Sequence, residues 1–268
     1  MALEADTSEA AADRASEPDD DVESSADIRH ANRGLYTLAR FTMSPLARML
    51  FRPRVIGRHN VPKRGPVIIA SNHLSFIDSV AIPMVSPRRV RFLAKSSYFD
   101  GTGARGRFQN LFFSSVGAIP VVRGAGSAAQ AALDQSRRII ESGEAFALYP
   151  EGTRSLDGRL YKGRTGAAWL ALTTGAPVVP VGLKRTNDFL PVGAKIPRNV
   201  RITIEFGKPL DLRHLGSADS GKARRQATDE IMSAIQKLSG QELAGAYNEA
   251  PPSGTVERVR RLIPHERR

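Results

Sequence analysis

Two polar clusters in the sequence combine side chains that can move protons and bind anions. The first contains Asn72, His73 and Asp78, and the second spans residues 149–155 with the letters Y-P-E-G-T-R-S. A carboxylate that accepts from one nitrogen of a histidine ring leaves the other nitrogen as a base. The chain has no cysteine and no G-x-S-x-G nucleophile elbow. His73 and Asp78 therefore suggest a base that activates a substrate hydroxyl without an acyl-enzyme, although for the pair taken alone a histidine that caps a loop and an aspartate that caps a helix is the more common arrangement.

Cations surround the second cluster. Arg154 lies within it, and a guanidinium is suited to bidentate contact with phosphate. Other basic side chains fall at or shortly after expected strand ends, namely Lys95, Arg123, Lys162 and Arg164. Each of them alone could be an ordinary surface charge. Together, cations that converge from successive strand ends predict an anion pocket.

The elements that must position these residues alternate along the chain. Hydrophobic patterning predicts strands at residues 66–70, 90–95, 118–122, 145–149, 177–183 and 200–206. It predicts helices at residues 77–85, 108–114, 127–142, 165–174 and 223–238, the third opened by a capping box from Ser127 to Gln130. The expected fold is α/β, with a mixed, largely parallel sheet flanked by helices. Both polar clusters directly follow a strand, where such folds bind ligands.

The two ends of the 268-residue chain differ in charge from its middle. Residues 1–27 hold ten of the 27 acidic and one of the 39 basic side chains, which predicts a disordered acidic tail. Residues 28–51 alternate leucines with arginines at helical spacing, which indicates short amphipathic helices at a membrane interface or, equally, helices packed on the core. We expect a catalytic domain over residues 52–242 and a basic C-terminal tail over residues 243–268.

Composition narrows the function classes. The absence of cysteine excludes disulfides, zinc fingers and iron–sulfur clusters, and the five histidines show no ligand spacing, so no metal is expected. Beyond the acidic tail, 38 basic and 17 acidic side chains remain. Such a field attracts nucleic acid, an anionic membrane or phosphorylated substrates. No nucleic-acid motif is present and aromatic residues make up 6%, so nucleic acid is not expected as a partner.

Four blocks of the sequence resemble those of the glycerolipid acyltransferases, the family of bacterial 1-acyl-sn-glycerol-3-phosphate acyltransferases. Asn72, His73 and Asp78 match the N-H-x4-D block, and residues 117–123, which end in Arg123, match the second. Residues 149–155 match F-P-E-G-T-R-S with Tyr149 for the usual Phe, and residues 176–181 match V-P-V-[IV]-P-V. The segment L-Y-K-G at residues 160–163 is similar to the family's F-K-K-G. The resemblance covers about residues 45 to 210.

The resemblance implies a reaction and a role for each matched residue. It implies acyl transfer from acyl-CoA or acyl carrier protein, as co-substrate and without a cofactor, to 1-acyl-sn-glycerol 3-phosphate, giving phosphatidic acid. His73 would be the base and Asp78 would orient it. The implied substrate-binding residues are Asn72 and Thr153, Glu151 and Gly152 for the glycerol backbone, and Lys95, Arg123, Arg154 and Lys162 for the phosphate.

The expected partners are therefore the lysophospholipid acceptor, the acyl donor and an anionic membrane surface. We expect the protein to be peripheral at the cytoplasmic face of the cell membrane. Two alternatives remain open at this point. One is acylation of another lysolipid or glycolipid, such as an ornithine lipid or a phosphoinositide-derived glycolipid. The other is a basic protein that binds membrane or nucleic acid without catalysis.

Overall fold

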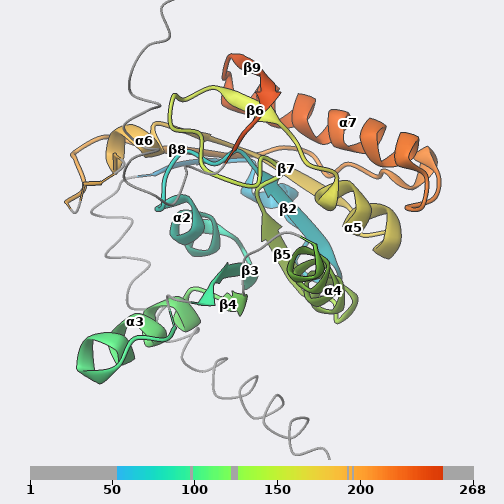
Figure 1. Ribbon diagram of the computed structural model, residues 1–268. Coiled ribbons are helices and arrows are strands. Elements are labelled where there is room, and N and C mark those ends of the chain that lie inside the picture. Colours follow the sequence, from blue (N-terminus) through green and yellow to red (C-terminus); the bar gives the residue numbers. More distant parts are fainter. Residues whose placement is uncertain (1–52, 97–98, 122–125, 192, 195, 250–268) are drawn as a thin grey trace, which may run out of the picture.

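A seven-stranded sheet forms the middle layer of the protein in the computed structural model, which describes residues 53–96, 99–121, 126–191, 193–194 and 196–249 (Figure 1). The order across the sheet is β1-β8-β7-β2-β5-β3-β4. In chain order these strands are β1 (Arg54–Ile56), β2 (Val67–Ser71), β3 (Val90–Lys95), β4 (Ala118–Val121), β5 (Ala145–Leu148), β7 (Val178–Lys184) and β8 (Thr203–Phe206). All neighbouring pairs are parallel except β7 with β8. The predicted mixed, largely parallel α/β sheet is thereby confirmed.

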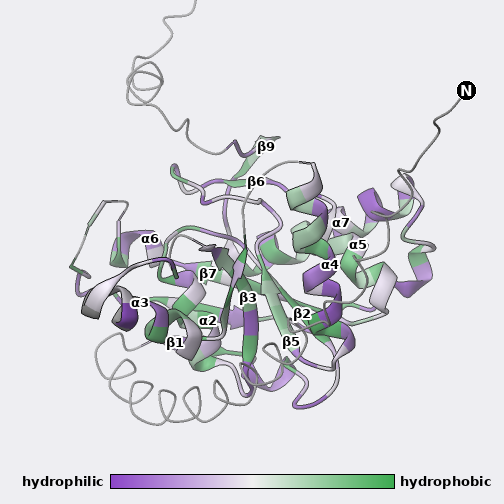
Figure 2. Ribbon diagram, turned by 60° about the horizontal axis from the view of Figure 1, so that its bottom comes forward, coloured by the Kyte–Doolittle hydropathy of each residue, from purple (hydrophilic) through white to green (hydrophobic). Residues whose placement is uncertain are grey.

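Two groups of helices cover the two faces of this sheet. Helices α2 (Asp78–Val85) and α3 (Gly103–Ser115) contribute to one apolar core, and α4 (Ser127–Glu141), α5 (Gly166–Thr174) and α7 (Gly221–Ser239) contribute to the other. Strand β2 shows why both faces must be covered, because Val67 and Ile69 join the first core and Ile68 and Ala70 join the second. Hydrophobic colour accordingly fills the central strands, while α4 and α7 show hydrophilic colour as well (Figure 2).

The connections that leave β2 and β5 diverge. These two strands are neighbours, with Ala70 paired to Leu148 near their carboxyl ends. The chain after β2 enters α2 on one face, whereas the chain after β5 passes through β6 (Leu160–Lys162) into α5 on the opposite face. Where neighbouring parallel strands send their connections to opposite faces, a crevice opens beyond their carboxyl ends. Both polar clusters of the sequence lie at this point.

Helix α7 carries the chain back towards the site. Of the apolar residues at helical spacing along it, Ala227, Ile231 and Ile235 are fully buried, and Leu238 near its end is half-buried. The helix ends at Gly240, whose φ of +70° is a left-handed value that favours glycine. The following segment, β9 (Leu243–Tyr247), pairs in parallel with β6 and forms a small second sheet. The predicted start of the C-terminal tail at residue 243 is therefore too early, because this segment is paired.

Other differences from the sequence-based expectations are local. The capping box is wrong, because α4 begins at Ser127 with Gly126 as its N-cap and no side chain caps it. Among the described residues, the strands β1, β6 and β9, the short helix α6 (Thr186–Phe189) and the 3-10 helices at Arg58–Asn60 and Arg213–Leu215 were not predicted. The tail over residues 1–27 and the amphipathic helices over residues 28–51 lie outside the described residues. Among the helices that the structure describes, none is long and apolar enough to cross a membrane.

Candidate active site

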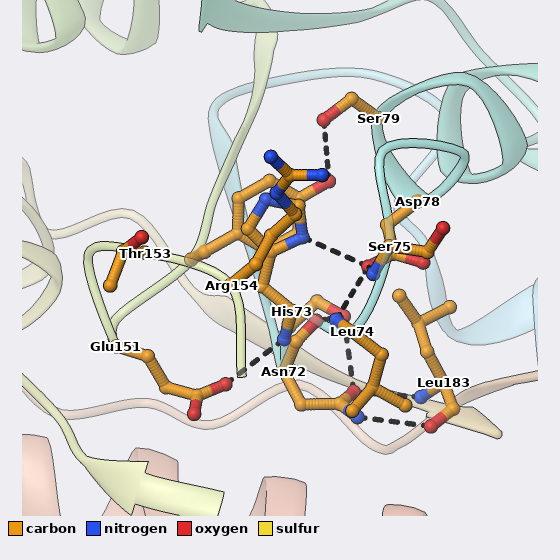
Figure 3. Close-up of polar contacts among 12 residues, drawn as sticks. Asn72, His73, Leu74, Ser75, Asp78, Ser79, Glu151, Thr153, Arg154 and Leu183 are labelled. Carbon is orange, nitrogen blue, oxygen red and sulfur yellow. Dashed lines mark hydrogen bonds and ion pairs between the residues drawn. The ribbon is translucent and has the colours of Figure 1, made fainter. Parts of the chain in front are cut away.

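His73 and Asp78 meet at the carboxyl end of β2. His73 lies in the loop after the strand, and Asp78 is the first residue of α2. The Asp78 Oδ2 atom is 2.9 Å from the His73 Nδ1 atom and also accepts hydrogen bonds from the Leu74 and Ser75 amides, both at 2.8 Å (Figure 3). Asp78 is fully buried, so these bonds fix the direction of its carboxylate. The tight turn between strand and helix thus produces the predicted pairing.

The ring of His73 is also held from one side. It stacks on the ring of Tyr149, with 3.8 Å between centroids and 7° between planes. The Tyr149 hydroxyl shares a hydrogen bond of 2.9 Å with Ser79 of α2, and burial raises the pKa of this phenol well above its usual value. The His73 side chain remains 13% exposed, and no described residue forms a hydrogen bond with its Nε2 atom. One ring nitrogen is therefore fixed by a carboxylate while the other stays available.

Glu151 supports the backbone of His73 from the loop after β5. Its Oε1 atom accepts from the His73 amide at 3.0 Å, and its Oε2 atom accepts from the Tyr161 amide at 3.0 Å. The carboxyl group is fully buried, and this desolvation raises its pKa to about 7 against the pull of the two amides. On its other side the His73 carbonyl accepts from the Ser155 amide at 2.7 Å. The second cluster therefore binds both the amide and the carbonyl of His73.

Gly152 makes the turn that brings this grip about. Its amide donates to the Tyr149 carbonyl at 3.0 Å, and its φ is +80°, in the region that favours glycine. The space beside it is also filled, because a Cβ atom here would come within 3.0 Å of the Arg164 side chain. A larger residue would strain the turn and displace Arg164. Gly152 thus shapes the loop through its backbone.

The predicted phosphate-binding cations do not all gather at the dyad. Arg154 adjoins Ser155, which bonds to His73, and its side chain extends to the same side as the His73 ring (Figure 3). Lys95 ends β3 at the carboxyl edge of the sheet, and Lys162 ends β6 in the small sheet; both are exposed. Within the described part of the chain, no hydrogen bond or ion pair involves the side chains of these three cations. Arg123 lies outside the described residues.

Asn72 occupies a different place from the one expected of a substrate-binding residue. It is fully buried; its Oδ1 atom accepts from the Leu183 amide at 2.8 Å and its Nδ2 atom donates to the Leu183 carbonyl at 2.9 Å. The same Nδ2 atom donates to Gln241 at 2.7 Å. Asn72 and the equally buried Glu151 therefore have no surface to offer a substrate, and both hold the loops in place. Thr153 is half-buried in the second loop.

Sequence reasoning missed several residues that build this site. Tyr149 stood in a recognised block, but nothing in the letters showed that its ring faces His73. Gln241 and Asn248 lie far along the chain and belong to no block, yet both bond to the site loops. The described residues contain no group of three or more His, Asp or Glu side chains placed to hold a metal ion.

Comparison with known proteins agrees with this geometry. A family model described as Acyltransferase matches residues 52–184. A 1-acyl-sn-glycerol-3-phosphate acyltransferase of Borreliella burgdorferi is 26% identical over 184 residues, which cover 69% of this chain and 72% of that protein. A chloroplastic enzyme of the same name from Brassica napus is 29% identical over 169 residues, which cover 60% of this chain and 47% of that protein.

The described fold also has a solved counterpart. The crystal structure of the 1-acyl-sn-glycerophosphate acyltransferase from Thermotoga maritima aligns with a TM-score of 0.57 and 21% identity, over 82% of this chain and 83% of that chain. This likeness shows a shared fold. The chain spans about half the length of the plant relatives that it matches. The matched family model covers the strands and loops that carry His73, Asp78 and residues 149–155. The resemblance seen in the sequence is thereby confirmed for this part of the chain: residues 52–184 match the Acyltransferase family model.

Proposed function

We propose that this protein transfers a fatty acyl group from an acyl thioester, of CoA or of acyl carrier protein, to the free hydroxyl of 1-acyl-sn-glycerol 3-phosphate, and so forms phosphatidic acid. The observation that carries the proposal is the His73–Asp78 pair joined to the loop of Arg154 at the carboxyl ends of β2 and β5. A base and a neighbouring free cation suit an acceptor that carries both a hydroxyl and a phosphate. The names of the relatives support the same acceptor.

The chemical step follows from the geometry of the ring. The Asp78 carboxylate accepts from Nδ1–H of His73, which leaves Nε2 as the base. Nε2 takes the proton of the acceptor hydroxyl as its oxygen attacks the thioester carbonyl carbon. The new C–O bond forms, the C–S bond breaks, and the proton passes to the departing thiolate. The products are an ester and a free thiol, with no covalent intermediate on the enzyme.

Binding of the acceptor falls to the carboxyl edge of the sheet. The guanidinium of Arg154 is half-buried and has no partner among the described residues, so it can take a phosphate in bidentate fashion. Lys95 lies at the same edge and adds positive charge. Glu151 contributes by fixing the loop that holds His73, in place of the direct contact with glycerol that the resemblance implies.

We further propose a peripheral position at the cytoplasmic face of the membrane. The acceptor is a lipid, and the excess of basic residues favours an anionic surface. Vesicles that contain anionic lipid should therefore sediment with the purified protein, and added salt should release it.

An acceptor and donor panel tests the reaction. Purified protein receives radiolabelled acyl-CoA or acyl carrier protein together with 1-acylglycerol 3-phosphate, other lysophospholipids, a lyso-ornithine lipid or monoacylglycerol, and the products are identified. Phosphatidic acid should dominate. Preference for a different lysolipid would replace the proposed acceptor, and a lack of acyl transfer to every acceptor would refute the function.

A further inference from the structure

The chain beyond α7 returns to the active site and braces it. Residues 240–248 lie past the part of the sequence that matches the family model. They begin at the left-handed Gly240, and β9 then runs beside β6, which itself follows the loop of Glu151 and Arg154 (Figure 1). Two amides in this segment, Gln241 and Asn248, reach back to the catalytic loops.

Gln241 links the two polar clusters. Its Oε1 atom accepts from Asn72 Nδ2 at 2.7 Å, and its Nε2 atom donates to the Gly158 carbonyl at 2.7 Å. Asn72 directly precedes His73, and Gly158 lies in the loop between β5 and β6 that also holds Glu151. A single side chain therefore ties the loop after β2 to the loop after β5.

Asn248 holds two successive carbonyl groups of the second loop. Its side chain is 8% exposed, and its Nδ2 atom donates to the Thr153 carbonyl at 3.3 Å and to the Arg154 carbonyl at 3.0 Å. Its own carbonyl accepts from the Arg164 guanidinium at 3.2 Å, and that side chain lies against Gly152. Asn248 thus contacts the loop directly and again through Arg164.

These two bonds determine where the amides of the loop point. The peptide bonds are trans, so each N–H points opposite to the carbonyl of the same peptide unit. Because both carbonyls point at Asn248, the Arg154 and Ser155 amides point away from it. The Ser155 amide donates to the His73 carbonyl, so the face of the loop that carries these amides is turned towards His73. The Arg154 amide has no hydrogen-bond partner within the described residues and is a free donor on this side.

We propose that Asn248, supported by Gln241, is a positioning residue that sets the Thr153–Arg154 peptide unit for the phosphate of the acceptor. This proposal rests on the proposed function, because it assigns the anion to the acceptor. A free amide next to a free guanidinium forms a two-part anion site. Without Asn248, the amide and the guanidinium of Arg154 remain in the chain, but the loop no longer holds them in one orientation.

Kinetics of Asn248→Ala provide the first test. KM for 1-acylglycerol 3-phosphate should rise roughly tenfold because two hydrogen bonds that orient the loop are lost, while kcat stays within about twofold. KM for monoacylglycerol, which has no phosphate, should change little. Asn248→Ser retains one hydroxyl donor and should give an intermediate KM; it also replaces the alanine variant if that one does not fold.

Tyr247→Phe is the matched control. Tyr247 precedes Asn248, and its hydroxyl accepts from Arg225 of α7 at 3.0 Å, a bond that does not touch the catalytic loops. KM for the phosphate acceptor should be unchanged in this variant. Equal KM values in the Tyr247 and Asn248 variants, or a rise in KM for monoacylglycerol as large as that for the phosphate acceptor, would overturn the proposal.

Hydrogen–deuterium exchange separates this proposal from the proposed function. Peptides that cover residues 150–158 should exchange faster in Asn248→Ala than in wild-type protein, and Tyr247→Phe should leave them unchanged. This measurement needs no substrate. If wild-type protein does not use 1-acylglycerol 3-phosphate, the proposed function fails and exchange alone decides whether Asn248 braces the loop. Equal exchange in the wild-type and Asn248 proteins overturns the brace in either case.

Discussion

Two arginines at the amino edge of the central sheet and two cations at its carboxyl edge differ in their partners. At the amino edge, Arg88 donates to the carbonyls of Pro62 at 3.3 Å, Gly65 at 2.6 Å and Gly143 at 2.7 Å. Arg91 forms an ion pair of 2.8 Å with Glu144. At the carboxyl edge, Arg154 and Lys95 have no such partners among the described residues. Arg88 and Arg91 thus connect loops at one edge, whereas Arg154 and Lys95 at the other edge are available for an anion.

This difference separates structural from functional charge without reference to sequence blocks. A guanidinium that already donates to several carbonyls would lose those bonds if it turned to a ligand. An unpaired cation beside a buried carboxylate–histidine pair carries no such cost. The state of its partners, more than its residue type, therefore marks a side chain as part of a binding site.

Glu151 is an exception that refines the comparison. It lies at the carboxyl edge, yet both of its oxygens accept hydrogen bonds from backbone amides. In this it is like Arg88 at the amino edge, whose side chain also bonds to the backbone of loops. Its burial keeps the charged form costly. The carboxyl edge therefore contains a buried support beneath its free groups.

The largest expected effect concerns the base. His73→Ala should lower kcat about 10²–10⁴-fold, because the group proposed to take the proton of the acceptor hydroxyl is removed. The melting temperature should change little, since the ring makes one polar bond and one stacking contact. Radiolabelled acyl transfer and thermal unfolding measure the two quantities. His214→Ala, an exposed histidine, is the control, and turnover near wild type in the His73 variant would refute the mechanism.

The next effect is a pH dependence of stability. Glu151 has a pKa of about 7 in the folded protein against a usual 4.5. Below pH 4.5 the group is protonated in both states. Between pH 4.5 and 7 the Glu151 carboxyl ionises in the unfolded chain but stays protonated in the folded protein, so its contribution to the free energy of unfolding falls as the pH rises. The total loss is about 3 kcal/mol once the pH exceeds 7.

Denaturant unfolding of wild type and Glu151→Gln across this pH range checks the sign. The difference in unfolding free energy, wild type minus variant, should decrease as the pH rises from 4.5 to above 7. Glu242→Gln, at an exposed carboxylate, should track the wild type throughout. A flat or rising difference would mean that Glu151 is ionised in the folded protein well below pH 7.

A smaller effect is expected from the free cation. Arg154→Ala should lower kcat/KM for 1-acylglycerol 3-phosphate. The loss should correspond to about 1.5–3 kcal/mol of transition-state stabilisation, because a charge-assisted contact with the phosphate is removed, and the stability of the fold should be unchanged. Monoacylglycerol should suffer much less. The matched control is Arg159→Ala, an exposed arginine paired with Asp157 in the same loop. If kcat/KM fell equally for both acceptors, Arg154 would have a structural role, as Arg88 and Arg91 do.

The smallest effect is expected at the amino edge. Arg88→Ala should lower the free energy of unfolding by about 1–2 kcal/mol, because three loop carbonyls lose a partly exposed partner. Turnover per folded molecule should stay at the wild-type value. Lys63→Ala, an exposed cation at the same edge, should alter neither quantity. If Arg88→Ala reduced turnover while stability held, the contrast between the two edges would be lost.

Prediction from sequence succeeded where a local signal was strong. The buried runs became β2, β5 and β7, and the stripe of α7 faces the core, because apolar periodicity reports burial directly. The signal failed for β6 and β9, which are short and pair only with each other among the described strands. It also failed at Ser127, where Gly126 took the cap position and left the hydroxyl unused.

The sequence by itself determined the α/β class and the resemblance to the acyltransferases. It left open whether His73 and Asp78 pair, and the folded turn between β2 and α2 decided this by bringing their side chains to 2.9 Å. Only the tertiary structure decided which polar residues are buried against neighbouring loops and which stay accessible. Asn72 and Glu151 have the chemistry of ligand-binding residues, but burial directs their hydrogen bonds to Leu183, His73 and Tyr161. Asn248 reaches the loop of Arg154 across 94 positions, and contacts of that range depend on packing that no local pattern encodes.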